Sequence, residues 1–361
     1  MQYLNNLLKI LKDKNASDLH LKVNAKPVMR VNGELTCIND IGVVNSDTMQ
    51  HFFEQITSEK QRETFARDKE LDFSYAAESI GRFRFSAYIQ RNSLSLTCRL
   101  IHTNIPTIDE LLLPDVCKKL ALKSSGLVLI CGPTGCGKST TLAAMIGYMN
   151  ETTKKMVITI EDPIEYLHQD KLCSFSQREV GMDTHSFSTA IRHALRQDPD
   201  VLLIGEMRDL DSISNTLTAA ETGHLVFTTL HTPNVVNAID RIIDVFPPHQ
   251  QEQVRVQLAD ILVGVIYQKL IPSTDGSRRI VACEVMLNNQ AVSNLIRSKK
   301  NFQLMTVIQG AGDKGMQTLD EAIYKLYEDG HISRDQALAS CVDQVQLKDR
   351  MMQRSVPRNS R

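Results

Sequence analysis

The stretch Gly132-Pro133-Thr134-Gly135-Cys136-Gly137-Lys138-Ser139-Thr140-Thr141 decides the fold of this chain of 361 residues. It joins an apolar run at residues 127–131 to a helix-like segment at residues 141–146. The fixed positions of the pattern G-x-x-x-x-G-K-[ST] are all filled, by Gly132, Gly137, Lys138 and Ser139. A glycine-rich turn that matched this pattern by chance would lack the strand before it and the helix after it.

The residue types in this stretch suit the binding of phosphates. Glycines let backbone N–H groups turn inward around phosphate oxygens, and the start of the following helix adds partial positive charge. Lys138 is expected to reach the β- and γ-phosphates, and the Ser139 hydroxyl is expected to hold Mg²⁺. The whole segment from Gly132 to Thr141 is therefore predicted to bind a nucleoside triphosphate.

The composition excludes several classes of function. With 41 basic and 42 acidic residues the net charge is −1, so neither nucleic acid nor an anionic membrane is expected as the main partner. The chain has no Trp and only 5% aromatic residues, which leaves little surface for stacking bases. Its eight Cys form no C-x-x-C pair, and no signal peptide or apolar span is recognisable. These features argue against a zinc site and favour the reducing cytoplasm.

Residues 1–102 are predicted to form a small α+β domain. The spacing of apolar residues predicts helices near residues 4–11 and 46–68. A hairpin turn is predicted at Asn32-Gly33. Polar and apolar residues alternate, as they do in half-buried strands, at residues 18–23, 71–75, 82–88 and 94–100.

A linker over residues 103–125 is expected to lead into an α/β domain over residues 126–361. In the linker, a Thr107–Glu110 capping box should open a short helix near Leu111. C-terminal helices are predicted at about residues 286–350, before a disordered tail. Nearly continuous Val, Ile and Leu runs, typical of a doubly wound parallel sheet, occupy residues 127–131, 156–160, 201–204 and 225–230.

Catalytic and metal-binding side chains are expected where these strands end, because ligands of open α/β sheets bind outside the carboxyl ends of the strands. Glu206 follows the third strand and is predicted to activate the attacking water; alternatively it is only a favourable charge at the start of the next helix. Glu161 and Glu165 follow the second strand and would either order Mg²⁺-bound waters or pair with arginines. Those arginines are Arg192 and Arg208. Metal contacts are thus expected from Ser139, Glu161 and Glu206.

Two histidines flank the fourth strand. His231 follows it and is expected to hydrogen-bond the γ-phosphate. His224 precedes it, so the two rings lie at opposite ends of the strand and cannot both contact one nucleotide unless a subunit boundary intervenes. His224 is therefore the weaker candidate for a direct contact.

A fast nucleotide hydrolase usually needs an arginine in addition to the lysine of the loop. The N-terminal domain offers four within one short segment: Arg82, Arg84, Arg91 and Arg99. Arg82 and Arg84 fall on one face of a strand. The four arginines form either a solvated basic surface or a group that reaches the nucleotide of an adjacent subunit, and the second case requires an oligomer.

Several segments together resemble the motor ATPases of secretion systems and pili. They match the Walker A, Asp box, Walker B and His box of that family, at residues 132–141, 160–166, 205–209 and 224–232. The similarity runs from Ser17 to Asp320, over nearly the whole chain. Within the family the chain looks most similar to the retraction ATPases of type IV pili and to their paralogues.

This resemblance implies a PAS-like N-terminal domain joined to a RecA-like domain, in a cytoplasmic homohexamer that hydrolyses ATP at its subunit interfaces. The implied motor associates peripherally with the inner membrane, where it acts on a platform protein of the pilus machinery, and a paralogous ATPase is a further implied partner. The resemblance raises Arg84 and Arg99 above the other arginines and makes His224 an interface element. An accessory retraction ATPase and an assembly ATPase of a related pilus or type II secretion system are the alternatives.

Three residues depart from the family pattern. Cys136 stands where Ser is usual, which would place a thiol against the phosphates and suggests redox sensitivity as a hypothesis. Thr228 replaces a usual Gly of the His box. Ser293 replaces the usual Arg of a retraction motif at Ala291–Arg297. The chain shows neither the longer N-terminal region nor the Cys-rich insert of assembly ATPases, which favours retraction.

Overall fold

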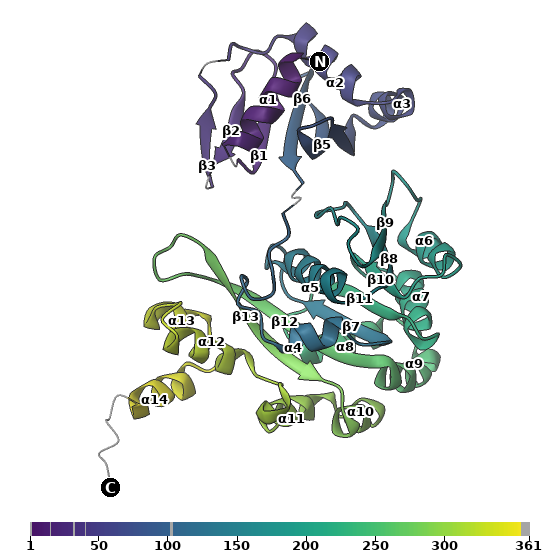
Figure 1. Ribbon diagram of the computed structural model, residues 1–361, viewed down its shortest axis with the longest axis vertical. Helices are drawn as coiled ribbons and strands as arrows, with labels where there is room; N and C mark the ends of the chain where they lie inside the picture. Colours follow the sequence, from purple (N-terminus) through teal and green to yellow (C-terminus); the bar gives the residue numbers. More distant parts are fainter. Residues whose placement is uncertain (1, 15, 32, 40, 102–103, 355–361) are drawn as a thin grey trace. The chain divides into compact units, whose positions relative to one another are not determined.

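The computed structural model describes residues 2–14, 16–31, 33–39, 41–101 and 104–354. The described chain forms two compact units (Figure 1). The N-terminal unit is Met1–Asn104 with Pro163–Leu167, and the C-terminal unit is Ile105–Asp162 with His168–Arg361. Three sequence predictions fall outside the described residues, at Asn32 of the hairpin turn, at the domain boundary of residues 102–103 and in the tail of residues 355–361.

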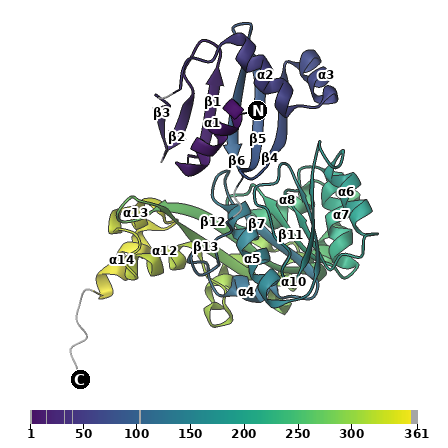
Figure 2. The same cartoon turned by 45° about the horizontal axis from the view of Figure 1, so that its top comes forward.

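The N-terminal unit is an antiparallel sheet with helices on one face (Figure 2). Its strands have the spatial order β3-β2-β1-β6-β5-β4. The strands are β1 Asp18–Lys22, β2 Val28–Val31, β3 Glu34–Cys37, β4 Glu70–Ala77, β5 Gly81–Gln90 and β6 Ser93–Leu100. The helices are α1 Gln2–Asp13, α2 Ser46–Ile56 and α3 Glu59–Asp68. The predicted hairpin is confirmed, with Val31 opposite Glu34.

One face of this sheet builds the core of the unit. The leucines of α1 lie on one side of the helix, because their spacing follows the helical period, and they are buried together with apolar residues of α2 and the sheet. In β5, Phe83 and Phe85 alternate with Arg82 and Arg84, so the two rings enter the core. The two arginines therefore lie on the opposite, polar face.

The prediction of a single helix over residues 46–68 is wrong, because the structure has two helices there. α2 ends at Ile56, and Ser58 caps α3. The Ser58 hydroxyl accepts a hydrogen bond from the N–H of Gln61, whose side chain accepts one from the N–H of Ser58. The break lies at this capping box, which the sequence analysis overlooked between the apolar residues Ile56 and Phe65.

The C-terminal unit contains a seven-stranded sheet in the order β13-β12-β7-β11-β10-β8-β9. All neighbours are parallel except β12 and β13. The four predicted strands are confirmed as β7 Gly126–Cys131, β8 Met156–Glu161, β10 Val201–Ile204 and β11 Leu225–Leu230. The sequence analysis missed three others, β9 Ser174–Glu179, β12 Leu262–Pro272 and β13 Arg279–Leu287.

Helices cover both faces of this sheet, which confirms the doubly wound α/β class (Figure 1). On one face lie α4 Val116–Ala121 and α5 Lys138–Thr152. On the other lie α6 Phe187–Ala194, α7 Leu210–Glu221, α8 Val235–Asp244 and α9 Pro248–Ile261. The C-terminal helices are α10 Gln290–Arg297, α11 Leu304–Gln309, α12 Leu319–Glu328, α13 Arg334–Ser340 and α14 Gln344–Arg354. Among the described helices, none has the length and apolar character that a membrane crossing requires.

The short helix predicted near Leu111 is wrong. The capping box itself forms: the Thr107 N–H donates to Glu110 Oε2 at 2.7 Å, and the Glu110 N–H donates to Thr107 Oγ1 at 3.1 Å. Residues 108–112 nevertheless form turns, and Leu112 has φ 56°. Because that backbone conformation ends a right-handed helix, α4 starts only at Val116, beyond Pro114.

Candidate active site

The phosphate loop, residues 132–137, connects the end of β7 to the start of α5. Gly132 has φ 144° and Gly137 has φ 89°, conformations that favour glycine. A Cβ at Gly132 would also lie 2.5 Å from the carbonyl oxygen of Gln268. α5 begins at Lys138 directly after the loop, so the N–H groups of its first turn lie beside the loop.

The predicted nucleotide contacts differ in exposure. Lys138 is buried, with 7% of its surface exposed, and Thr141, one turn into α5, is buried as well. The tip of the loop is exposed at Pro133, Thr134 and Gly135, whereas Ser139 and Thr140 are half-buried. Thr141 is therefore placed to support the loop from within the core rather than to face solvent.

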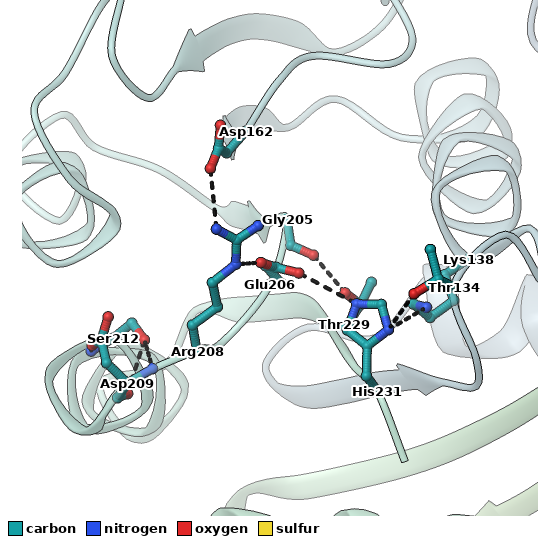
Figure 3. A network of polar contacts seen from close by, with 10 residues as sticks. All are labelled: Thr134, Lys138, Asp162, Gly205, Glu206, Arg208, Asp209, Ser212, Thr229 and His231. Atoms are coloured by element: carbon teal, nitrogen blue, oxygen red, sulfur yellow. Dashed lines mark hydrogen bonds and ion pairs between the residues drawn. The ribbon is translucent and has the colours of Figure 1, made fainter. Parts of the chain in front are cut away.

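Lys138 lies at the centre of the loop. Its Nζ donates hydrogen bonds to the carbonyl oxygens of Gly132 at 3.0 Å and Pro133 at 3.1 Å. The same atom lies 3.4 Å from Nδ1 of His231, which follows β11 (Figure 3). A buried ammonium needs such partners, because an unpaired charge in the interior is costly.

The position of Lys138 fixes the tautomer of His231. An ammonium can only donate hydrogen bonds, so Nδ1 of His231 accepts and Nε2 carries the proton. That Nε2 lies 3.4 Å from Oε2 of Glu206. Burial lowers the pKa of His231 below its ordinary value, and the charges of Lys138 and Arg208 lower it further. His231 is therefore neutral at neutral pH and links the loop lysine to the carboxylate of Glu206 (Figure 3).

Glu206 follows β10 and is 83% removed from solvent, since 17% of its side chain is exposed. The carbonyl oxygen of the preceding Gly205 accepts a hydrogen bond from Thr229 Oγ1 at 2.6 Å, which fixes this strand end against β11. The alternative role of Glu206, a charge at the start of the next helix, belongs to another residue. Asp209 caps α7, and its carboxylate accepts from the N–H of Ser212 at 2.7 Å.

The sequence did not identify Arg208 as a member of this site. Its Nε forms an ion pair with Glu206, and its Nη1 lies 3.4 Å from Oδ2 of Asp162 (Figure 3). The sequence suggested Arg208 only as a partner of Glu161 or Glu165. The structure instead makes it a bridge between the strand ends of β8 and β10, because these strands are neighbours in the sheet.

Glu161 and Glu165, predicted as a pair, belong to different compact units. Glu161 is the last residue of β8, and its carboxylate accepts hydrogen bonds from Thr159 Oγ1 at 2.6 Å and Gln177 Nε2 at 3.4 Å. Glu165 is exposed and lies in the Pro163–Leu167 segment of the N-terminal unit. Of the two, Glu161 is the one at a strand end beside β10.

His224 lies at the far end of β11 from His231. Its Nδ1 is 3.0 Å from the carbonyl oxygen of Ala219 and 3.1 Å from Thr222 Oγ1. Its own carbonyl accepts the N–H of Gly126, at the start of β7. His224 therefore lies at the amino-terminal ends of these parallel strands, whereas the phosphate loop lies at their carboxyl ends.

The candidate arginines belong to the N-terminal unit. Arg84 of β5 lies opposite Arg99 of β6 on the polar face of the sheet. The Nε of Arg99 donates to Asp18 Oδ1 at 2.8 Å, and Nη2 of Arg84 lies 3.5 Å from Asp72 Oδ2. Burial raises the pKa of Asp18, but hydrogen bonds from Arg99 and Ser17 outweigh it and leave the pKa below its ordinary value. The side chain of Arg99 remains 65% exposed.

The other two arginines are placed differently. Arg82 shares the face of Arg84, two residues away on β5. Arg91 is exposed in the turn between β5 and β6 and has φ 47°. Only three of the four arginines therefore lie together on the sheet.

The oxygen donors at the loop and at the neighbouring strand ends are of the kind that a magnesium ion prefers. Among the residues that the structure describes, no group of three or more His, Cys, Asp or Glu side chains could hold a metal by itself. Mg²⁺ does not need such a group, because it keeps several waters and binds through one or two protein oxygens and substrate phosphates. Ser139 in the first turn of α5, with Glu161 and Glu206 at the strand ends, supplies a sparse oxygen set of this kind.

Thr228 and Ser293, which depart from the family pattern, are both buried. Thr228 lies in β11 between Ile204 and Leu129, and its Oγ1 has no hydrogen-bond partner in the described part of the chain. Ser293 of α10 donates to the carbonyl oxygen of Ala259 in α9 at 3.0 Å. At position 293 a short side chain thus joins two helices.

Cys136 should not react with a maleimide in the native protein, with or without nucleotide. Its Sγ is buried against Gly132, where a Cβ would lie only 2.7 Å away. Burial raises the pKa of this thiol, and the charge of Lys138 only partly opposes the effect. Since the thiolate is the reactive form, brief labelling followed by mass spectrometry should modify the exposed Cys37 and spare Cys136. ATP-protectable labelling of Cys136 would contradict this expectation and restore the redox hypothesis.

The chain is similar to known proteins over most of its length. The type II/IV secretion system protein family matches residues 110–339. The chain is 44% identical to the type IV pilus retraction ATPase PilT of Pseudomonas aeruginosa over 331 residues, which cover 92% of this chain and 96% of that protein. It is 43% identical to the type IV pilus ATPase PilU of the same organism over 333 residues, covering 92% and 87%.

A solved structure shows the same similarity in three dimensions. The crystal structure of the pilus retraction motor PilT with bound ADP matches with a TM-score of 0.88 at 43% identity, over 95% of this chain and 99% of that chain. The strand ends that carry Lys138, Glu206 and His231 thus lie in the fold of a known nucleotide-binding motor. This chain belongs to the type II/IV secretion system protein family, as an ATPase of its pilus branch.

Proposed function

We propose that this protein is an ATP-hydrolysing motor that powers type IV pilus retraction, and so twitching motility. The observation that carries the proposal is the connected set Lys138, His231 and Glu206 at neighbouring strand ends, in a chain 44% identical to a retraction ATPase. A phosphate-binding lysine, a neutral imidazole and a carboxylate at one edge of a sheet suit hydrolysis of a bound triphosphate.

In the proposed reaction, residues 132–141 bind the phosphates of ATP through backbone N–H groups and Lys138. Glu206 orients the attacking water and accepts its proton, and Arg208 and His231 hold that carboxylate in place. Ser139 would hold Mg²⁺, with Glu161 and Glu206 acting through its waters, and the bound ion would offset charge on the phosphates. His231 lies beside the loop. To donate a hydrogen bond to the γ-phosphate, the ring would turn its protonated Nε2 from Glu206 toward that phosphate.

We also propose that the site is completed by another subunit of a homohexamer. The polar face of the N-terminal sheet presents Arg84 and Arg99, with Arg82 beside them and Arg91 in the adjoining turn, and His224 serves as an interface element. An exposed guanidinium can approach the phosphates of a neighbour and offset transition-state charge. The retention of 65% exposure by Arg99, despite its ion pair, supports this role over a purely internal one.

The proposed organisation comprises a PAS-like domain over residues 1–102, a linker over residues 103–125 and a RecA-like domain over residues 126–361. The compact units support it, although Ile105 and the residues after it pack with the C-terminal unit. The motor is proposed to work in the cytoplasm, peripherally on the inner membrane. Its partners there are a pilus platform protein and a paralogous ATPase.

A deletion strain tests the function directly. Loss of a retraction motor should leave cells with more surface pili and no twitching, since pili assemble but are not withdrawn. Pili are counted by shearing and electron microscopy, and twitching is measured as the spreading zone under agar. Complementation with the intact gene is the control. Bald cells would instead indicate an assembly motor, and unchanged cells an accessory one; either result overturns the proposal.

A further inference from the structure

Strand β12 continues past the point where its neighbour β7 ends. The last paired residues are Tyr267 of β12 and Cys131 of β7, yet β12 extends to Pro272. Gln268 is the first residue beyond this pairing. The phosphate loop therefore leaves β7 beside a strand that is still extended, and Gln268 is the residue it meets first.

Gln268 contacts both ends of the phosphate loop. Its carbonyl oxygen lies against Gly132, where a Cβ would come within 2.5 Å. Its side-chain Nε2 donates a hydrogen bond to the carbonyl oxygen of Cys136 at 2.7 Å. The side chain is fully buried, and a Cβ at Gly137 would lie 3.4 Å from the same Nε2. One residue of β12 thus fixes where the loop begins and where it ends.

This hydrogen bond determines where one loop N–H points. In a trans peptide the carbonyl and the next N–H point in opposite directions. Because the Cys136 carbonyl is held toward Gln268, the N–H of Gly137 is aimed away from β12. A flipped Gln268 amide would set its oxygen against the carbonyl oxygen of Cys136, so the direction of the donor is also fixed.

We propose that Gln268 is a positioning residue for the diphosphate portion of the nucleotide. It holds the Cys136–Gly137 peptide so that the Gly137 N–H faces a phosphate oxygen before the nucleotide arrives. The inference rests on the proposed function, in which this loop binds ATP and ADP. Because the positioned donor serves phosphates that ADP and ATP share, both nucleotides depend on it.

A purely structural role for Gln268 would lower thermal stability in Gln268→Met without changing nucleotide affinity. The Oε1 of Gln268 is buried with no hydrogen-bond partner among the residues described. Replacement by Met keeps the size of the side chain and removes this unpaired acceptor, but it also leaves the Cys136 carbonyl without its donor. These two effects oppose each other, so thermal stability should change little while nucleotide affinity falls.

The experiment compares ADP and ATP binding by calorimetry in the full chain, using E206Q as the background for ATP so that hydrolysis does not interfere. Gln268→Met should bind both nucleotides about tenfold more weakly, a difference of about 1.4 kcal/mol. Gln317→Met is the matched control, because Gln317 Nε2 donates to another Cys carbonyl, that of Cys283, at 2.8 Å. The control should bind ADP as the wild-type protein does.

The outcomes separate this inference from the proposed function. A wild-type protein that binds no ADP overturns the proposed function, and the inference falls with it. Wild-type binding with unchanged affinity in Gln268→Met overturns the inference alone. Gln268→Glu is a second variant, expected to bind more weakly than Gln268→Met because its carboxylate repels phosphates. If neither variant folds, amide exchange of the wild-type protein decides, since ADP must then protect the Gly137 N–H.

Discussion

Replacing Glu206 by Gln will leave ATP binding intact and lower the rate of ATP hydrolysis at least ~100-fold. Gln keeps the shape of the side chain and can still orient a water through its oxygen, but it cannot accept the proton. The substitution removes the negative charge at position 206, so the interactions with Arg208 and His231 become weaker. The side chain at position 206 is then held less firmly as well. Steady-state phosphate release and equilibrium binding of ATP measure the two effects separately.

Asp162→Asn is the matched control for Glu206→Gln. Asp162 contacts the same Arg208, at 3.4 Å, and the substitution removes the same unit of charge. Because Asp162 lies on the far side of the guanidinium from the loop, its loss should lower turnover only a few-fold, in keeping with a partly exposed ion pair (Figure 3). Near-normal turnover in Glu206→Gln would remove Glu206 from its role as the base.

Replacing Arg99 by Ala will lower ATP hydrolysis by about 1,000-fold in the assembled protein, because an arginine at the transferring phosphate contributes this much in related phosphoryl transfer. Nucleotide binding by the loop should persist, since Arg99 belongs to the N-terminal unit. The substitution also leaves Asp18 buried without its partner, and its side chain is only 9% exposed. The double variant Arg99→Ala with Asp18→Asn removes that unpaired charge and should recover stability without recovering turnover.

Mixing variants tests whether Arg99 acts on a neighbouring subunit. Arg99→Ala and Glu206→Gln are each expected to be nearly inactive alone. In a mixed oligomer, some sites combine an intact Glu206 from one subunit with an intact Arg99 from the next, and hydrolysis should reappear. Arg91→Ala serves as a control, because that side chain lies in a turn and should affect turnover little. Demonstrated mixing without recovered hydrolysis would show that Arg99 does not act in trans.

Sequence reasoning succeeded where the chemistry is local. The glycine spacing around Lys138, between an apolar run and a helix-like segment, specifies a phosphate loop. Runs of Val, Ile and Leu revealed four strands of the parallel sheet, because such strands are buried on both faces. Glu206 and His231 could then be placed at one edge from the rule that parallel strands present their carboxyl ends together.

What the sequence could not supply was the order of the strands. The pairing of Arg208 with Asp162 depends on β10 lying beside β8, and the bond from Gln268 to Cys136 joins residues 132 positions apart. β12 follows α9 without an intervening loop, so no turn signal marked its start. Contacts of this kind are properties of the folded sheet, and periodicity within one segment does not encode them.

The ion pair of Arg99 with Asp18 reduces the side-chain entropy that Arg99 would lose on entering the proposed subunit interface. A free arginine side chain loses about 2 kcal/mol of rotamer freedom when it is immobilised at a contact. Here the buried carboxylate of Asp18 already restricts the guanidinium when the N-terminal unit folds. Most of that loss therefore occurs within the single subunit, and in the proposed hexamer an arginine held in this way would enter the interface in one orientation.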